Sequence, residues 1–252
     1  MSNKFLDMTM FKNSFFLLFI LLFICCKSKT VVVSNTKPIV VENDSKIFVK
    51  KNDTVNNVSD KILIVTSQAI SDTSFVNLKN YSNDFLLDMK YATNDNFLKT
   101  KVYDCEECYL RLKTVRMLIN ANNDFLERGY RIKLFDCYRP LDIQKKMWNI
   151  VSNPEYVADP AKGSIHNRGG AVDITLVDKD GKELDMGTTF DFFGIEASHN
   201  YKNLSEDVLK NRIILKEIMI KNNFKSFDSE WWHYNLQDSN QDKLANFKWK
   251  CD

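Results

Sequence analysis

Histidine is scarce in this chain, and two of its three histidines have acidic residues close by. Asp173 follows His166 by seven residues, and Glu230 precedes His233 by three. Hydrolytic zinc sites typically take three ligands from histidine and carboxylate side chains and keep a fourth position for water, whose pKa the metal lowers. The pattern therefore predicts one zinc ion (Zn2+) held by His166, Asp173 and His233. Glu230 would then stand beside the water as an unligated general base.

The chain around His166 has the local sequence of a turn followed by a strand. Gly169 and Gly170 permit a tight backbone turn, and residues 171–177 alternate in the manner of a strand. Such a turn would bring Asp173 back towards His166. Taken alone, a histidine beside a glycine pair is more often a loop residue than a ligand, so the prediction of a metal site depends on both segments together.

The segment that carries Glu230 and His233 is rich in aromatic residues and favours a strand over a helix. In a regular strand, residues three apart point to opposite faces. Glu230 and His233 can therefore face the same metal only if the strand bends or bulges near Trp231 or Trp232. The two tryptophans themselves are expected in the core or in a pocket wall rather than in the chemistry.

The pattern Ser-x-His-x-x-Gly-x-Ala-x-Asp at residues 164–173, with Glu-x-Trp-His at 230–233, resembles the zinc D-alanyl-D-alanine dipeptidases of the VanX type. Their superfamily also contains D,D- and L,D-carboxypeptidases and the hedgehog-type zinc fold. The resemblance runs from about residue 80 to about residue 237 and includes further segments, namely 89–97 (MKYATNDNF), 136–140 (DCYRP), 185–191 (DMGTTFD) and 198–199 (SH).

The resemblance implies roles for four more residues. Arg139 would donate hydrogen bonds to the scissile carbonyl oxygen as it becomes an oxyanion. Asp191 would bind the free ammonium group of a dipeptide, Ser164 would bind its carboxylate, and Tyr91 would help to form the ammonium pocket. Each has a plainer alternative from the residues alone: a structural arginine, a turn aspartate, a loop serine and a core tyrosine.

Outside the predicted zinc site, the third histidine and the last four cysteines also have candidate roles. His199, the third histidine, is expected to lie behind the metal ligands or to be structural, because three ligands and water fill a four-coordinate site. Cys137 stands where the resembling family usually has glycine, which affects only local backbone geometry. Cys105 and Cys108 form Cys-x-x-Cys, but no second pair at zinc-finger spacing follows. A disulfide among the last four cysteines (Cys105, Cys108, Cys137 and Cys251) and free buried thiols are both compatible with the sequence.

The remaining pattern predicts an α+β fold, a single domain with a central antiparallel sheet flanked by helices. Residues 110–128 have helical spacing and end at Gly129. Ser205 caps a second predicted helix that runs to about Lys221. Other expected elements are a strand at 132–136, a helix at 141–151 for which Pro140 is a favourable first helical residue, and a hairpin turn at 180–181 before a strand leading to Met186.

The N-terminus resembles a bacterial lipoprotein signal. Lysines precede an apolar run at residues 15–24, which is shorter than the span of about 20 residues that a bilayer requires. Cys26 at the end of this run is the expected lipidation site, and an ordinary signal peptide or an uncleaved anchor is the alternative. Residues 1–26 are thus predicted to be a signal peptide, 27–75 a polar tether and 76–252 the zinc dipeptidase domain. An exported, lipid-anchored protein of the bacterial cell envelope, facing the periplasm, is the corresponding expectation.

Composition limits the classes of partner. The formal net charge of +2 argues against a nucleic-acid-binding protein, which would normally carry a basic patch. The charge thus predicts no nucleic-acid partner, the resemblance implies a small dipeptide substrate, and the N-terminal segment predicts membrane contact only through its anchor. Hydrolysis of D-Ala-D-Ala derived from peptidoglycan is the leading interpretation. The alternatives are a D,D- or L,D-carboxypeptidase acting on stem peptides and a non-catalytic zinc module that binds the cell wall. The sequence gives no oligomeric state.

Overall fold

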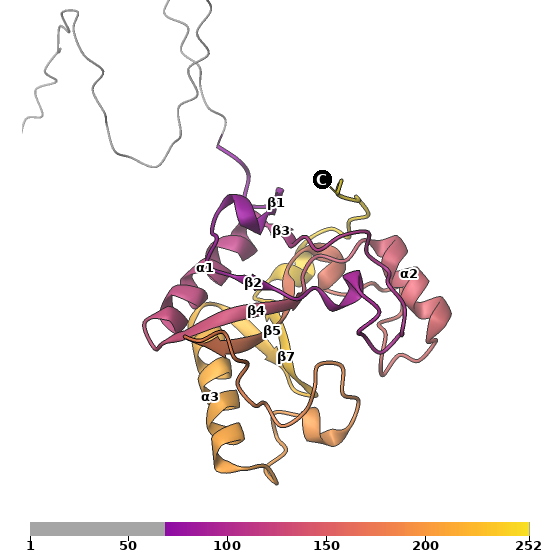
Figure 1. Cartoon of the computed structure of the whole chain (residues 1–252). Helices are drawn as coiled ribbons and strands as arrows, with labels where there is room; N and C mark the ends of the chain where they lie inside the picture. Colours follow the sequence, from indigo (N-terminus) through magenta and orange to yellow (C-terminus); the bar gives the residue numbers. More distant parts are fainter. Residues whose placement is uncertain (1–68, 252) are drawn as a thin grey trace, which may run out of the picture. The chain divides into compact units, whose positions relative to one another are not determined.

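The computed structural model describes residues 69–251, drawn in colour in Figure 1. The predicted signal peptide, Cys26 and most of the predicted tether lie outside the described residues. Within the described part no helix is both long and apolar enough to cross a membrane. The structure describes the last residues of the predicted tether: Arg111 donates to the backbone oxygen of Thr73, and Phe75 begins a strand. The folded region therefore begins before residue 76.

The helices and strands alternate irregularly along the chain. The α-helices are α1 (Leu112–Leu126), α2 (Leu141–Ile150) and α3 (Glu206–Lys221). The strands are β1 (Phe75–Asn77), β2 (Leu86–Leu87), β3 (Tyr109–Arg111), β4 (Tyr130–Asp136), β5 (Ala171–Asp178), β6 (Phe224–Phe227) and β7 (Glu230–Leu236).

A five-stranded sheet with the order β2-β4-β5-β7-β6 forms the centre of the fold, and β1 pairs with β3 in a separate ribbon. Every pair in the large sheet is antiparallel except β2 with β4, which is parallel. The expected α+β fold with an antiparallel sheet and flanking helices is confirmed, with one parallel strand added at its edge. In Figure 1, α1 and α3 lie together on one side of the sheet and α2 lies apart from them.

The central strand β5 separates the core from the polar site. Val172, Ile174 and Leu176 are fully buried and belong to one apolar cluster with Leu118 of α1 and Leu215 of α3. Because successive side chains of a strand point to opposite faces, the residues between them point away from these helices. Asp173 is one of these intervening residues, so the strand that fills the core also delivers a carboxylate to the opposite face.

The predicted helix boundaries agree with the structure to within two residues. Gly129 has a φ of +80°, which favours glycine, and it lies just beyond the end of α1. The Ser205 side chain accepts a hydrogen bond from the backbone N–H of Val208 and caps α3. Pro140 is the extended residue before α2 rather than its first helical residue. The turn after β5 is present, but the strand expected before Met186 is reduced to an isolated bridge.

Two disulfides occur among the described residues. One joins Cys105 to Cys251, and the other joins Cys108 to Cys137. Cys105 and Cys108 therefore do not pair with each other, and their Cys-x-x-Cys spacing is not a redox or zinc motif here. Of the two possibilities that the sequence left open, disulfides rather than free thiols are present.

Candidate active site

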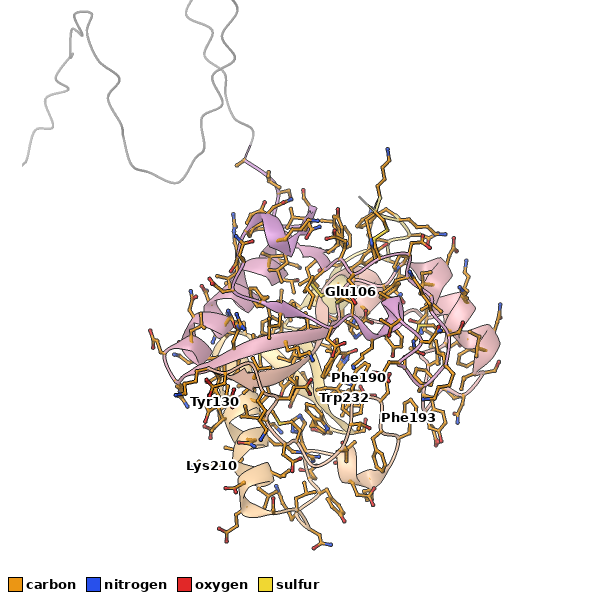
Figure 2. All side chains as sticks on the ribbon, in the orientation of Figure 1. Glu106, Tyr130, Phe190, Phe193, Lys210 and Trp232 are labelled. Atoms are coloured by element: carbon orange, nitrogen blue, oxygen red, sulfur yellow. A yellow bond between two sulfur atoms is a disulfide. The ribbon has the colours of Figure 1, made fainter. Side chains whose placement is uncertain are left out.

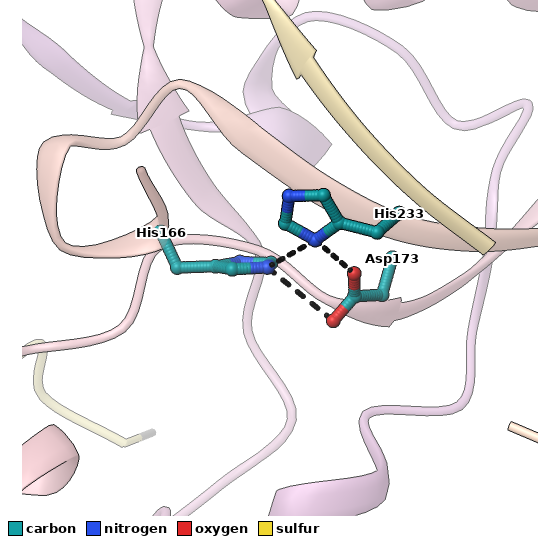
Figure 3. A group of neighbouring side chains, drawn as sticks. All are labelled: His166, Asp173 and His233. Atoms are coloured by element: carbon teal, nitrogen blue, oxygen red, sulfur yellow. Dashed lines mark hydrogen bonds and ion pairs between the residues drawn. The ribbon is translucent and has the colours of Figure 1, made fainter. Parts of the chain in front are cut away.

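Three side chains from separate parts of the chain meet at one point, namely His166, Asp173 and His233 (Figure 3). Nε2 of His166 lies 3.2 Å from Nδ1 of His233 and 3.4 Å from Oδ2 of Asp173. Nδ1 of His233 lies 2.9 Å from Oδ1 of Asp173. Four-coordinate zinc, with bonds of about 2.0 to 2.2 Å, spaces its ligand atoms roughly 3.3 Å apart. The cluster therefore fits a zinc site in both donor type and spacing.

Backbone pairing places these side chains. Asp173 of β5 lies directly opposite His233 of β7, and side chains paired in this way share a face. His166 lies in a short 3-10 turn that Gly169 ends with a φ of +71°. A Cβ on Gly169 would lie 2.2 Å from the ring of Phe75, so both backbone conformation and space require glycine there. The glycine turn that the sequence predicted is present.

A bulge brings Glu230 to the same point. Ser226 of β6 pairs with Tyr234 of β7, but the next residue, Phe227, pairs with Glu230, so the register shifts. The residues of β7 between these pairs are the two tryptophans and His233, where the sequence required a bend. Oε2 of Glu230 consequently lies 4.0 Å from Nδ1 of His233, close to the cluster without belonging to it.

The outer nitrogen of each histidine is held by an acceptor. Nδ1 of His166 donates to the backbone oxygen of Cys137 at 2.7 Å, and Nε2 of His233 donates to Oδ1 of Asn235 at 2.9 Å. The other nitrogen of each ring faces the cluster, where a metal ion would bind to its lone pair in place of a proton. Acceptors placed in this way fix both the tautomer and the orientation of metal-binding histidines.

The cluster carries strongly opposed charges. Burial alone would raise the pKa of Asp173, but His166 and His233 hold this pKa below its ordinary value. Burial likewise opposes the charge on His233, but Asp173 and Glu230 raise its pKa to about 9. His233 therefore carries a proton at neutral pH in this arrangement, and a metal ion would replace that proton as the positive charge next to Asp173.

Glu230 combines burial with proximity to the cluster. Burial raises the pKa of its carboxyl, and the negative charge of Asp173 adds to this effect, whereas His233, His166 and Arg139 oppose it. A carboxyl group whose pKa lies above its ordinary value accepts and releases protons nearer to neutral pH. Glu230 is thus suited to proton transfer rather than to permanent charge.

Arg139 is buried beside the cluster and held rigidly. Its Nε and Nη2 donate to Oδ2 of Asp136 at 3.1 and 2.6 Å, and its Nη1 donates to Oε1 of Gln144 at 3.0 Å. Burial would lower its pKa, but Asp136 and other neighbours raise it, so the guanidinium stays charged. These bonds use three of the five N–H groups of an arginine. One N–H on each terminal nitrogen is not used by these bonds, and Arg139 lines the pocket.

A cavity of about 790 Å³ contains the cluster, and Glu230, Arg139, Tyr91, Asp191 and Ser164 all contribute to its walls. The three residues with predicted substrate roles therefore open onto the same space as the predicted ligands. Tyr91 also fits its plainer alternative, a core tyrosine, because its side chain is fully buried and belongs to the apolar core cluster.

Asp191 and Ser164 have defined partners in this cavity. The hydroxyl of Tyr91 donates to Oδ2 of Asp191 at 2.9 Å, and the hydroxyl of Ser164 donates to Oδ1 of Asn167 at 3.2 Å. Burial raises the pKa of Asp191 well above its ordinary value, and nearby Asp173 raises it further. A cation bound next to Asp191 would relieve both penalties.

Aromatic side chains form part of the wall. Trp232 and Phe193 line the cavity, and Phe190 packs against Trp232 with ring centroids 5.5 Å apart (Figure 2). Trp231 is buried, and its indole N–H donates to Oγ1 of Thr188 at 2.8 Å. The expectation that the tryptophans belong to the core and the pocket wall agrees with these positions.

His199 does not belong to the metal-type cluster formed by the other two histidines. It is buried, and its Nε2 has no hydrogen-bond partner among the described residues. Burial lowers its pKa to about 4, and nearby Lys216 and Arg212 lower it as well. Its neutral, buried state agrees with the structural role that the sequence predicted.

Sequence reasoning missed the residues that hold the site in place. Asp136 and Gln144 orient Arg139, and Asn235 orients His233. Asp136 is completely buried. It lies within the segment 136–140 that carries part of the family resemblance, but no role was predicted for it. A buried carboxylate next to the predicted catalytic arginine would have indicated the role of Asp136, but its burial cannot be read from the sequence.

Comparison with known proteins gives a consistent set of matches. A family model described as D-ala-D-ala dipeptidase matches residues 71–249. The chain is 33% identical over 184 residues to the D-alanyl-D-alanine dipeptidase of Escherichia coli (strain K12), covering 72% of this chain and 95% of that protein. It is 31% identical over 175 residues to the D-alanyl-D-alanine dipeptidase of Enterococcus faecium, and 30% identical over 176 residues to that of Streptomyces coelicolor. Each of these two alignments covers 60% of this chain and 85% of the relative.

Proposed function

The chain belongs to the D-Ala-D-Ala dipeptidase family of peptidases, and from this premise we propose that it hydrolyses free D-Ala-D-Ala with one bound zinc ion. One observation carries the proposal: the His166–Asp173–His233 cluster, a carboxyl suited to proton transfer, a charged arginine and a buried aspartate all line one cavity. Each of these groups serves one step in the hydrolysis of a dipeptide that has two free ends.

In this proposal, zinc binds at the cluster of two histidines and one aspartate. His166, Asp173 and His233 supply two imidazoles and a carboxylate, which is a donor set that zinc accepts readily. When bound, zinc would lower the pKa of a water molecule and polarise the scissile carbonyl. The hydrogen bonds from His166 to Cys137 and from His233 to Asn235 keep both imidazoles in the tautomer that binding needs.

Glu230 and Arg139 perform the proton transfer and the charge stabilisation. Glu230 takes a proton from the attacking water and returns it to the departing amine, for which its raised pKa is suitable. Arg139 donates its two remaining N–H groups to the carbonyl oxygen as negative charge develops there. Asp136 and Gln144 hold the guanidinium in place before the substrate arrives, so little reorganisation is needed in the transition state.

Asp191 favours a free dipeptide over a longer chain. Its buried carboxyl accepts a hydrogen bond from Tyr91, and a substrate ammonium group would supply the positive charge that this carboxyl needs. A D,D- or L,D-carboxypeptidase acts on a blocked peptide, which offers no ammonium group at this position. Ser164 lines the same cavity and would bind the terminal carboxylate. Glu230 and Arg139 argue against a non-catalytic wall-binding module, which needs neither a base nor an oxyanion donor.

The N-terminal sequence supports an envelope location. We propose that residues 1–26 direct export, that Cys26 carries a lipid, and that the segment after it tethers the enzyme to the membrane. An exported enzyme meets dipeptide released from peptidoglycan rather than cytoplasmic precursor. Wall turnover or nutrient recovery is therefore the role that this location favours.

A substrate comparison tests the proposal. The full-length chain, solubilised in detergent and loaded with zinc, is incubated with D-Ala-D-Ala, with N-acetyl-D-Ala-D-Ala and with a pentapeptide stem. We expect release of D-Ala from the free dipeptide and at least about tenfold slower cleavage of the blocked substrates, because a lost charged hydrogen bond costs about 1.5–3 kcal/mol. Faster cleavage of either blocked substrate would instead establish a carboxypeptidase, and no cleavage of any substrate would favour the binding module.

A further inference from the structure

One wall of the loop that carries His166 is the segment from Cys137 to Arg139. The imidazole of His166 donates to the backbone oxygen of Cys137 at 2.7 Å. The backbone N–H of Arg139 donates to the backbone oxygen of His166 at 3.1 Å, and the amide of Asn167 donates to the backbone oxygen of Arg139 at 2.8 Å. Both the side chain and the main chain of His166 thus take their position from this segment.

The other wall of the same loop is β3 together with the start of α1. The backbone N–H of Arg111 donates to the backbone oxygen of Gly169 at 3.0 Å, and the hydroxyl of Thr114 donates to the same oxygen at 3.0 Å. Nε of Arg111 donates to the backbone oxygen of Arg168 at 2.6 Å. The loop that carries His166 is therefore fixed between two segments that are distant from each other in the sequence.

A disulfide joins these two walls directly. Cys108 immediately precedes β3 and is bonded to Cys137, whose backbone oxygen holds the His166 imidazole. Cys108 and Cys137 are both buried, at 2% and 0% exposure. The backbone N–H of Tyr138 also donates to the backbone oxygen of Tyr109 at 3.0 Å, so a hydrogen bond joins the same two segments next to the disulfide.

We propose that the Cys108–Cys137 disulfide is a positioning element for the zinc ligand His166. By fixing the carbonyl of Cys137 relative to β3, the disulfide sets the direction in which the imidazole points. Opening it leaves the ligands in place but loosens their geometry. The inference rests on the proposed zinc site and adds a residue pair that makes no contact with metal or substrate.

The second disulfide provides a matched control. Cys105 and Cys251 link the region before β3 to the C-terminal end of the chain, and Cys251 is exposed. Neither cysteine makes a hydrogen bond to the His166 loop among the described contacts. Both disulfides close loops, with sequence separations of 146 and 29, and both are expected to stabilise the fold. Only one of them includes the residue that holds a proposed ligand.

Zinc affinity separates a positioning role from general stabilisation. In Cys108→Ala/Cys137→Ala we expect the dissociation constant for zinc, measured against a competing chelator, to rise about tenfold, the lower end of the effect of losing an outer-shell partner. In Cys105→Ala/Cys251→Ala we expect a change of less than about twofold, even though the melting temperature falls in both. We also expect kcat at saturating zinc to fall more than KM rises in the first variant alone.

A further variant and a reduction experiment complete the test. Cys108→Val/Cys137→Ala refills much of the buried volume and serves if the alanine pair folds poorly. In the wild-type protein, a phosphine reductant should open the exposed disulfide first, as followed by alkylation and mass spectrometry, and zinc affinity should fall only when the buried disulfide opens. Equal zinc affinity in both disulfide variants would overturn the inference while leaving the zinc enzyme intact. A wild-type chain that binds no zinc would overturn the zinc site and the inference together.

Discussion

Asp173 and His233 lie directly opposite each other on β5 and β7, with Oδ1 of the carboxylate 2.9 Å from Nδ1 of the imidazole. This pairing sets two ligands of the proposed zinc site by strand register alone. A slip of one residue in either strand would turn one of the two side chains to the opposite face of the sheet. The third proposed ligand comes from a glycine turn, and the proposed base comes from a bulge, so the site combines three different local structures.

Replacing Glu230 separates metal binding from turnover. We expect Glu230→Ala to retain one equivalent of zinc and to lose about 100- to 10,000-fold in kcat, the range that general acid–base catalysis contributes. Metal analysis beside a D-Ala release assay measures both quantities on the same sample. A variant with near-normal turnover would show that another group acts as the base.

Asn235 holds His233 through a single acceptor oxygen. We expect Asn235→Leu to weaken zinc binding by about 10- to 100-fold, because the imidazole loses the partner that fixes its tautomer. Asn235→Asp keeps an acceptor oxygen and should bind zinc more tightly than Asn235→Leu. Chelator competition gives both constants, and equal affinities in the two variants would show that the Asn235 contact does not position His233.

Asp191 should control the choice between free and blocked substrates. We expect Asp191→Asn to reduce kcat/KM for D-Ala-D-Ala by about 10- to 100-fold, since a hydrogen bond to a charged group contributes about 1.5–3 kcal/mol. Cleavage of N-acetyl-D-Ala-D-Ala should change far less, because that substrate has no ammonium group. Tyr91→Phe, which removes only the hydroxyl next to Asp191, should have the same direction and a smaller effect. Equal losses on both substrates would assign Asp191 to the fold instead.

His199 gives the fold a defined sensitivity to acid. Burial lowers its pKa to about 4 in the folded state, and Lys216, Arg212 and Lys202 add to this effect against the opposing charge of Asp228. The unfolded chain, with an ordinary histidine pKa of about 6.5, binds more protons between these two values. The free energy of unfolding should therefore be unaffected by this group above about pH 6.5 and should fall by up to about 3 kcal/mol as the pH drops to about 4.

Comparison with a variant isolates this contribution from other titrating groups. The difference in unfolding free energy between wild type and His199→Gln, measured by urea denaturation, should change between pH 7 and pH 4, with the wild type losing more stability. A constant difference across this range would show that His199 is not held neutral by burial.

Local patterns predicted much of the geometry of the site because the positions of the proposed ligands depend on local structure. Alternation in β5, the glycines after His166 and the need for a bend between Glu230 and His233 are all visible in the sequence, and all three occur in the structure. The Ser205 cap of α3 was visible for the same reason. The roles of Arg139, Asp191, Ser164 and Tyr91 came from resemblance, and they remain predictions that the shared cavity supports.

Contacts between residues far apart in the chain could not be predicted from the sequence. Two residues of β2 pair in parallel with β4, and a strand so short has no detectable period. Four cysteines allow three pairings, and nothing in their spacing selects the two that occur. Asp136 orients Arg139 because both side chains are buried together. Only the packed fold determines which polar groups lose contact with water.

The location of the metal tests the central claim most directly. Crystals of the zinc-loaded protein, measured on both sides of the zinc absorption edge, should show one anomalous peak about 2.0–2.2 Å from Nε2 of His166, a carboxylate oxygen of Asp173 and Nδ1 of His233. Glu230 should lie beside this peak without binding it. A peak bound by other residues, or zinc-treated crystals with no peak among these three side chains, would contradict the account.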